Sequence, residues 1–321
     1  MLRVGNSQDR GSMKKQKVFF IYRKSMIDAG STIMRVHQLA AIANAMLGEK
    51  YECSILRMPN KNFPTIQRLW VKLQPKGAVY FFSKKALISI SQSNLEMLQK
   101  KAAGICFDYV DANLKQIRTA GVDIHLCSSY SQRNALENLL KENSINGKPM
   151  MLLHNTDQRL YKLKRVDLER ARIAYLGTRS VTVFNEEIEK RVDYLDASTA
   201  KNFELNYEKL VDYNLHYAMR KSPPQDINVV SPFTKGFTAA VLNSNIIINK
   251  YSVDAVEFLG EDYPYLVEGE RNILNTIDLA NDSFGSKMWY DALDVMHGVA
   301  NRISPKSIAT QIEAILKELG V

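Results

Sequence analysis

The fold of this chain is decided by the stretch Ser231-Pro-Phe-Thr-Lys-Gly-Phe-Thr-Ala-Ala-Val-Leu-Asn-Ser-Asn-Ile-Ile-Ile-Asn249, which is followed by Leu259-Gly-Glu-Asp-Tyr-Pro-Tyr-Leu266. We interpret it as a loop of small and cationic residues, one short helix and a buried strand. Such a loop presents backbone N–H groups and Lys235 at a helix N-terminus, where an anion is stabilised. The alternative is an ordinary helix–strand unit of a doubly wound domain.

Strands and helices alternate on both sides of this stretch. In the first half of the chain we predict strands at 17–22, 51–58, 77–82, 105–110, 122–127 and 149–154. In the second half we predict them at 170–177, 191–195, 212–220 and 245–249. The alternation predicts an α/β protein with mostly parallel sheets covered by helices. The polar stretch 155–169 separates the halves, so we predict domains at 13–157 and 158–321, the second carrying the terminal helices.

The length of 321 residues and the mass of 36.5 kDa allow two domains of ordinary size. Hydrophobic residues make up 45% of the chain and charged residues 24%, which is typical of globular proteins. No apolar run approaches the about 20 residues that cross a bilayer, so we expect a cytoplasmic protein. We interpret residues 1–12 as a tag remnant before a native start at Met13. Cys53, Cys106 and Cys127 lack metal-ligand spacing and are expected to be buried, reduced thiols.

The net charge is +9, and one block, from Cys53 to Leu95, contains no acidic residue. Its basic residues are Arg57, Lys61, Arg68, Lys72, Lys76, Lys84 and Lys85. Within it, residues 64–74 predict a short helix with Pro in its first turn. Its apolar residues share one face by helical spacing, and they are Ile66, Leu69, Trp70 and Leu73. The pattern favours a core-packing helix with solvated charges; the alternative is a peripheral contact of 61–85 with the inner face of the membrane.

Further motifs occur in the order expected of GT-B glycosyltransferases, which the chain resembles from about Lys17 to Leu266. They are Ala29-Gly-Ser-Thr32, Arg35-Val-His-Gln-Leu-Ala-Ala41, Cys106-Phe-Asp-Tyr-Val-Asp111, His125-Leu-Cys-Ser-Ser129, His154-Asn-Thr-Asp157 and Ala174-Tyr-Leu-Gly-Thr-Arg179. The resemblance implies two Rossmann-like αβα domains that face a cleft, with the acceptor bound by the first and the nucleotide sugar by the second. It implies transfer of the sugar to a glycan or lipid-linked acceptor in surface polysaccharide or glycoconjugate synthesis, without a metal or other cofactor.

The candidates for the donor site are Gly177, Thr178, Arg179, His216, Thr234, Lys235, Gly236 and Glu268. The loop residues 234–236 supply a hydroxyl, an ammonium group and backbone N–H groups for a leaving diphosphate. Residues 177–179 follow a predicted strand at the ligand edge of the sheet, where Arg179 is either a phosphate clamp or a solvated side chain. His216 either lines the nucleotide pocket or is structural. Glu268 and Glu270 either hold ribose or sugar hydroxyls or mark a helix N-terminus.

On the acceptor side, Asp28 follows the first predicted strand and faces the expected cleft. We predict that its carboxylate is the catalytic base, the alternative being an Asp that caps a turn. His37 is a second candidate, although its helical position suits packing. The candidates for acceptor binding are Gly30, Arg35, Asp108 and Asp111, and the two Asp could instead cap the next helix.

Two other functions remain open from the sequence. One is a nucleotide-sugar epimerase of the same fold, which requires a cluster of acid and base residues that the sequence does not show. The other is a non-enzymatic, basic nucleotide- or nucleic-acid-binding protein, but the basic block lacks interleaved aromatic residues and we expect no nucleic-acid partner. Many retaining GT-B enzymes place two Glu in the donor loop, whereas residues 233–245 contain no acidic residue. This difference leaves the stereochemical outcome open.

Overall fold

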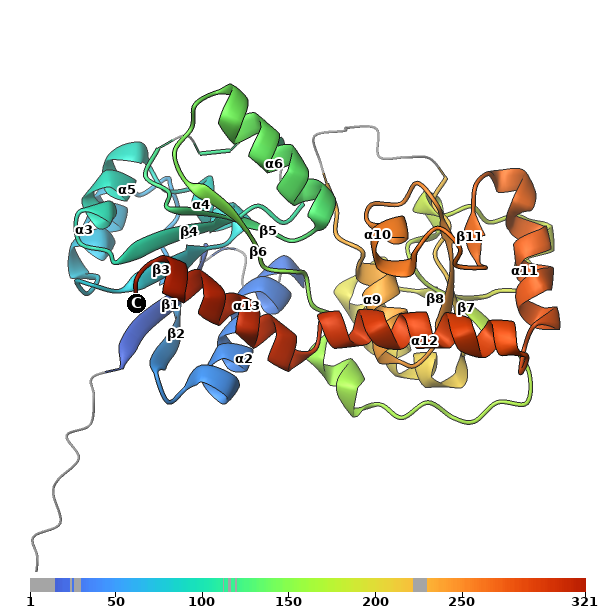
Figure 1. Cartoon of the computed structure of the whole chain (residues 1–321). Coiled ribbons are helices and arrows are strands. Elements are labelled where there is room, and N and C mark those ends of the chain that lie inside the picture. The colour runs from blue at the N-terminus through green and yellow to red at the C-terminus, as the bar shows by residue number, and fades with distance from the viewer. Residues whose placement is uncertain are drawn as a thin grey trace, which may run out of the picture.

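The computed structural model describes residues 15–23, 25, 30–111, 113–114, 117–118, 120–221 and 230–321. Asp28 and the predicted tag remnant at 1–12 lie outside the described residues. Two parallel sheets, each covered by helices, form two halves of the molecule (Figure 1). The predicted α/β class with two Rossmann-like domains is therefore confirmed.

The first sheet has six strands in the order β2-β1-β3-β4-β5-β6. They are β1 (Gln16–Arg23), β2 (Tyr51–Met58), β3 (Val79–Phe82), β4 (Gly104–Asp108), β5 (Ile124–Cys127) and β6 (Lys148–Met151). The second sheet has five strands in the order β11-β10-β9-β7-β8. They are β7 (Ile173–Gly177), β8 (Asp193–Asp196), β9 (Leu215–Tyr217), β10 (Asn245–Asn249) and β11 (Leu266–Val267). Strands such as β3, β4 and β10 are buried at every position, because helices cover both faces of a parallel sheet.

Helices connect the strands in both halves. Those of the first half are α1 (Gly30–Thr32), the π-helix η2 (Ile33–His37), α2 (Gln38–Leu47), α3 (Pro64–Leu73), α4 (Lys84–Leu87), α5 (Gln92–Gln99) and α6 (Tyr130–Glu142). Those of the second are the 3-10 helix η4 (Gln158–Lys162), η5 (Arg179–Val181), α7 (Glu186–Glu189), α8 (Ala200–Asn206), η6 (Tyr207–Asp212), α9 (Thr234–Val241), α10 (Ala255–Leu259), η7 (Glu270–Asn272), α11 (Ile273–Asp282), α12 (Lys287–Arg302) and α13 (Pro305–Glu318). Within the described ranges, no helix combines the length and the apolar composition needed to cross a bilayer.

The last helix, α13, returns to the first half of the molecule and lies beside α2 (Figure 1). Gln311 Oε1 accepts a hydrogen bond of 2.8 Å from the Leu153 backbone N–H, and Glu313 pairs with Lys50 at 2.8 Å. We predicted the terminal helices with the second domain, and α12 does lie there. The difference at α13 arises because its apolar face packs on α2, a long-range contact with no local sequence signal.

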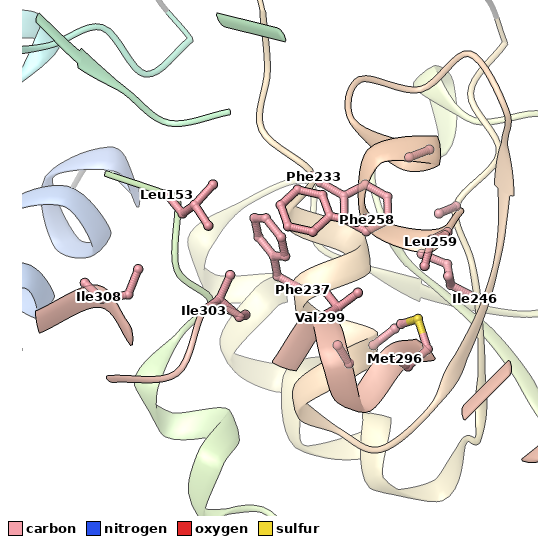
Figure 2. Packing of buried hydrophobic residues seen from close by; sticks show 14 of the residues in the cluster. Leu153, Phe233, Phe237, Ile246, Phe258, Leu259, Met296, Val299, Ile303 and Ile308 are labelled. Carbon is pink, nitrogen blue, oxygen red and sulfur yellow. The ribbon is translucent and has the colours of Figure 1, made fainter. Parts of the chain in front are cut away.

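One hydrophobic core continues through the junction of the two halves. Figure 2 shows Leu153, from the end of the first half, and Ile303, between α12 and α13, in the same group of side chains as Phe237 of α9. All three are less than 5% exposed. The three cysteines are also buried and free, as the sequence predicted. The halves are therefore joined by shared packing as well as by the chain.

Helix α3 does not pack as the sequence pattern favoured. It buries Gln67 and Val71, whereas Ile66, Leu69 and Leu73 are each more than half exposed. The Gln67 amide donates 3.0 Å to Ser89 O and accepts 3.0 Å from the Asn94 side chain, so the polar side of the helix is turned inward. Helical spacing determines which residues share a face but not which face meets the protein.

Candidate functional site

Three cavities adjoin at the N-terminus of α9, and Thr234 lines all of them. Their volumes are about 40, 150 and 500 Å³. The helix begins after Phe233, whose ring is buried, and the Thr234 N–H donates 2.8 Å to Pro232 O. First-turn N–H groups of a helix have no intrahelical acceptor and carry the positive end of the helix dipole. The predicted anion-binding helix start is thus placed at the junction of these cavities.

Lys235 lines the two smaller cavities and turns its side chain under the end of β7. Its Nζ donates 2.6 Å to Leu176 O and lies 4.2 Å from the centre of the Tyr175 ring. Desolvation, with a smaller contribution from the charge of Arg220, lowers the pKa of Lys235 to about 7. No described carboxylate forms an ion pair with this ammonium group. A half-buried cation held by a carbonyl and an aromatic ring is ready to pair with an anionic ligand.

The smallest cavity brings a second cation to the same helix start. Arg220, which follows β9, lines it together with Ser231 and Ser252, whose hydroxyls can donate to phosphate oxygens. Arg220 is exposed, and its backbone N–H donates 2.7 Å to the Asn249 side chain. Two cationic side chains, hydroxyl groups and a helix N-terminus form a suitable site for a phosphate or diphosphate.

His216, in β9, lines the cavity of about 150 Å³ beside Lys235. Burial, and then the charge of Lys235, lower the pKa of His216 to about 3, so its imidazole is neutral at physiological pH. Its Nε2 atom is buried and has no hydrogen-bond partner. An unpaired buried polar atom is costly, and a ligand in this cavity would satisfy it.

The largest of these three cavities, of about 500 Å³, is lined from both halves of the molecule. Gly30 of α1 and Met34 of η2 contribute from the first half, and η2 is a π-helical turn of the kind often found at functional sites. From the second half, Arg159 pairs with Asp157 and Glu204, each at 2.7 Å. Burial of Asp157 favours its protonated form, but hydrogen bonds from Arg159 outweigh this effect and lower the pKa of the carboxyl group. The cavity is therefore a cleft with a charged rim.

Two glycines let the backbone pack closely around α9. A Cβ atom on Gly236 would lie 1.8 Å from the Phe233 ring, which stacks on Phe258 with the centroids 5.4 Å apart. A Cβ on Gly177 would lie 2.6 Å from the Tyr175 hydroxyl and 2.9 Å from Lys235 Nζ. Gly177 therefore leaves the space that the Lys235 ammonium group occupies, and Gly236 leaves the space for Phe233.

Other predicted donor residues lie elsewhere. Arg179 pairs with Glu189 and stacks over Phe184 at 5.2 Å, and it lines none of the three cavities. Glu268 is exposed and pairs with Lys250 at 3.0 Å. Thr178 accepts a hydrogen bond of 3.1 Å at its backbone O from the Tyr175 hydroxyl. The structure thus brings together Thr234, Lys235, Gly236, Gly177 and His216 but not Arg179 or Glu268.

The predicted acceptor residues are also divided. Arg35 and Asp108 form a buried ion pair of 2.6 Å, and Arg35 also donates 2.8 Å to both Leu152 O and Leu153 O. These contacts fix η2 to β4 and to the segment after β6, and they occupy both side chains. Asp111 has a positive φ of 50°, and its backbone O accepts from Lys84. Of the four predicted residues, Gly30 alone lines the cleft.

Sequence reasoning missed Arg220, Asp157 and Arg159. Arg220 follows β9 as Arg179 follows β7, so the rule that ligands bind at strand ends pointed equally to both. Asp157 and Arg159 lie in the polar stretch that we interpreted as a domain boundary. His37 packs its ring on Tyr22, with the centroids 5.5 Å apart, and its Nε2 is buried without a partner.

No protein-family model matches this sequence, and no curated protein matches it. Solved structures do. A glycosyltransferase from Rickettsia africae ESF-5 superimposes with a TM-score of 0.61 and 10% identity, over 95% of this chain and 98% of that one. Anabaena HepE in complex with UDP superimposes with a TM-score of 0.57 and 10% identity, over 94% of this chain and 100% of that one. The α,α-trehalose 6-phosphate synthase from Burkholderia multivorans superimposes with a TM-score of 0.56 and 6% identity, over 96% of this chain and 98% of that one.

These similarities extend over nearly the full length of each pair of chains at low identity, so they define the fold. The superposition includes both parallel sheets of this chain and the helices that cover them, with the cleft between the two halves. The chain has the GT-B fold of the glycosyltransferases, with two Rossmann-like domains facing a cleft.

Proposed function

We propose that this protein is a glycosyltransferase that moves a hexosyl or related sugar from a nucleotide-sugar donor to a glycan or lipid-linked acceptor. The observation that supports it most directly is the meeting of Lys235, Arg220 and the α9 N-terminus at one set of cavities, which opens into a cleft lined by both domains. HepE has been solved with UDP and with UDP-glucose, which favours a uridine diphosphate sugar as the donor here.

In the proposed reaction, the bond between the sugar and the diphosphate breaks while the acceptor oxygen attacks the anomeric carbon. Negative charge develops on the leaving diphosphate, and Lys235, Arg220 and the first-turn N–H groups of α9 stabilise it. Lys235 and the first-turn N–H groups are held in place before the ligand arrives, so they need little reorganisation. In this proposal they perform that role without a metal ion. His216, being neutral, serves as a hydrogen-bond partner in the same cavity.

The acceptor is expected to enter the cleft beside Gly30 and Met34. Asp28, the proposed base, lies two residues before Gly30 in the sequence. An Asp28→Asn variant should retain donor binding and lose transfer. We further propose a role in surface polysaccharide or glycoconjugate synthesis at the cytoplasmic side of the membrane.

A thermal-shift titration tests the donor site, because a ligand that binds only the folded state raises the melting temperature. Wild type, Lys235→Ala and the control Lys306→Ala, an exposed lysine on α13, are titrated with UDP, UDP-glucose, UMP and other nucleoside diphosphates. We expect UDP to stabilise wild type and the control. The loss of a charged hydrogen-bond partner costs about 1.5–3 kcal/mol, so Lys235→Ala should bind roughly 10- to 150-fold more weakly. Equal stabilisation of all three proteins would place the diphosphate elsewhere.

A further inference from the structure

An exposed apolar face runs along α3 and the residue that precedes it. We define this α3 face by its four large apolar side chains and their exposed fractions, which are Phe63 (56%), Ile66 (55%), Leu69 (57%) and Leu73 (74%). Their spacing brings them to one side of the helix. Trp70, partly buried, lies next to them on the helix surface. A contiguous apolar surface of this kind marks an interaction site more often than a chance exposure.

The helix is held in this orientation by buried polar contacts. Gln67 is 1% exposed, and its amide bonds to Ser89 O, the Asn94 side chain, the Ser91 N–H and Pro59 O at 3.0–3.3 Å. Turning the apolar face inward would carry Gln67 out to solvent and leave its buried partners, the Ser89 carbonyl and the Asn94 amide, without that hydrogen bond, at a cost of about 1–3 kcal/mol. The exposed face is therefore a stable feature of the fold.

Basic side chains lie beside the α3 face. They are Lys61, Arg68, Lys72 and Lys76, and all four are exposed. None of them takes part in an ion pair among the described residues. The sequence around them has no acidic residue from Cys53 to Leu95. The α3 face is thus an apolar stripe with an uncompensated positive flank.

We propose that the α3 face binds the surface of an anionic lipid bilayer. An interfacial helix places its apolar side chains about 5–10 Å into the boundary between headgroups and acyl chains, and its cationic flank meets the anionic headgroups. The tryptophan suits the same boundary, because its ring is apolar and its N–H is polar. A second copy of this chain fits the face less well, since two positive flanks would then meet.

The position of α3 leaves the candidate site open. In Figure 1, α3 lies at the end of the first domain that is farthest from the second domain. None of the three cavities around α9 is lined by a residue of 61–85. Docking through α3 would therefore hold the protein at a bilayer without covering the cleft. This proposal stands independently of the sugar-transfer reaction, because it rests on other residues.

The test is co-sedimentation of the full chain with vesicles of phosphatidylcholine alone or mixed with phosphatidylglycerol. Two variants each remove one part of the surface: Leu69→Ser/Leu73→Ser and Arg68→Gln/Lys72→Gln. The control, Lys201→Gln/Leu205→Ser on α8, removes one exposed lysine and one leucine that is 62% exposed. Circular dichroism melting of all four proteins shows whether each is folded.

We expect wild type and the control to bind the anionic vesicles, and to bind more weakly as salt rises. Because each basic residue near an anionic surface contributes about 1 kcal/mol, Arg68→Gln/Lys72→Gln should bind roughly 30-fold more weakly. The serine variant should lose at least about 10-fold. In a Trp289→Phe background, which leaves Trp70 as the remaining tryptophan, anionic vesicles should shift its fluorescence to shorter wavelength.

The proposal would be overturned if wild type did not bind vesicles, or if it bound neutral and anionic vesicles equally. It would also be overturned if both α3 variants were folded and still bound. A concentration-dependent dimer of wild type that Leu69→Ser/Leu73→Ser abolishes, together with no vesicle binding, would assign the α3 face to a second copy instead.

Discussion

Lys235 shows how a single residue acquires its chemistry from its surroundings. In water its ammonium group would be charged up to high pH, but here the ring of Tyr175 and the carbonyl of Leu176 replace most of its solvent. Desolvation disfavours the charged form and lowers the pKa to about 7. A bound diphosphate would reverse this effect, because an adjacent anion favours the protonated lysine. The same residue therefore destabilises the empty protein and strengthens the site when it is filled.

A pH dependence of stability follows from this pKa. Below pH 7 Lys235 is charged in both states and the cost of its burial is fully present. Between pH 7 and 10.5 the unfolded chain keeps a proton that the folded protein has released, so stability rises with pH. We expect Lys235→Met to be more stable than wild type at pH 6 by on the order of 2 kcal/mol, with the difference shrinking by pH 9. Urea unfolding of both proteins at pH 6 and pH 9 measures this difference in stability.

The control for this experiment is Lys306→Met, on the exposed surface of α13, where the difference from wild type should not change with pH. A difference for Lys235→Met that stays constant or grows as pH rises would show that the folded protein does not depress the pKa of this lysine.

At the scale of elements, the N-terminus of α6 is capped from the other domain. Asp254, which precedes α10, accepts from the backbone N–H groups of Tyr130 and Ser131 at 2.6 and 2.9 Å and from the Ser131 hydroxyl at 2.5 Å. It adopts a left-handed conformation with φ of 58° to do so. Phe258 packs on Tyr130 in the same contact, with the ring centroids 5.5 Å apart. One carboxylate thus stabilises a helix and ties the domains together.

Replacing Asp254 by Ala should therefore weaken both the N-terminus of α6 and the contact between the domains. Loss of a capping side chain costs about 0.5–2 kcal/mol, and here the loss also removes contacts between domains. We expect a lower melting temperature and a larger radius of gyration in small-angle scattering. Asn185→Ala, which removes a cap of 2.9 Å within the second domain, should lower stability without changing the radius. Identical scattering from wild type and Asp254→Ala would mean that other contacts hold the cleft closed.

At the scale of the whole molecule, the two domains are not independent units of the sequence. Helix α13 comes last in the chain but covers α2 in the first domain, and the core around Leu153, Ile303 and Phe237 is shared. Ile308, Ile312 and Ile315 of α13 are fully buried there. Domain movement around the cleft would thus bend the segment between α12 and α13.

Removal of α13 should expose this surface. We expect residues 13–157 alone to unfold without a cooperative transition, because burying three isoleucines contributes about 1.5–3 kcal/mol each. Co-expression with residues 304–321 should restore cooperative melting, measured by circular dichroism. A scrambled peptide of the same composition is the control. Cooperative melting of residues 13–157 without the peptide would show that the first domain does not need α13.

Residues of the candidate site were predicted to different extents. Thr234, Lys235 and Gly236 could be found because a loop, a cation and a helix start follow one another in the sequence. Arg35 and Asp108 could not be assigned correctly to a surface or to the interior, since their burial depends on each being opposite the other in the folded chain. Arg220 lies at the same cavity as Lys235 only because the chain folds, and no local pattern connects the two residues.

By itself, the sequence determined the alternation of strands and helices, the two halves, and the short helix between the 231–236 loop and the strand at 245–249, because hydrophobic period and local turn chemistry act over a few residues. The tertiary structure alone decided that α3 turns Gln67 inward and its apolar face outward. It also decided that α13 completes the first domain and that Lys235 loses its water. These properties depend on which distant surfaces meet, and local propensity carries no information about them.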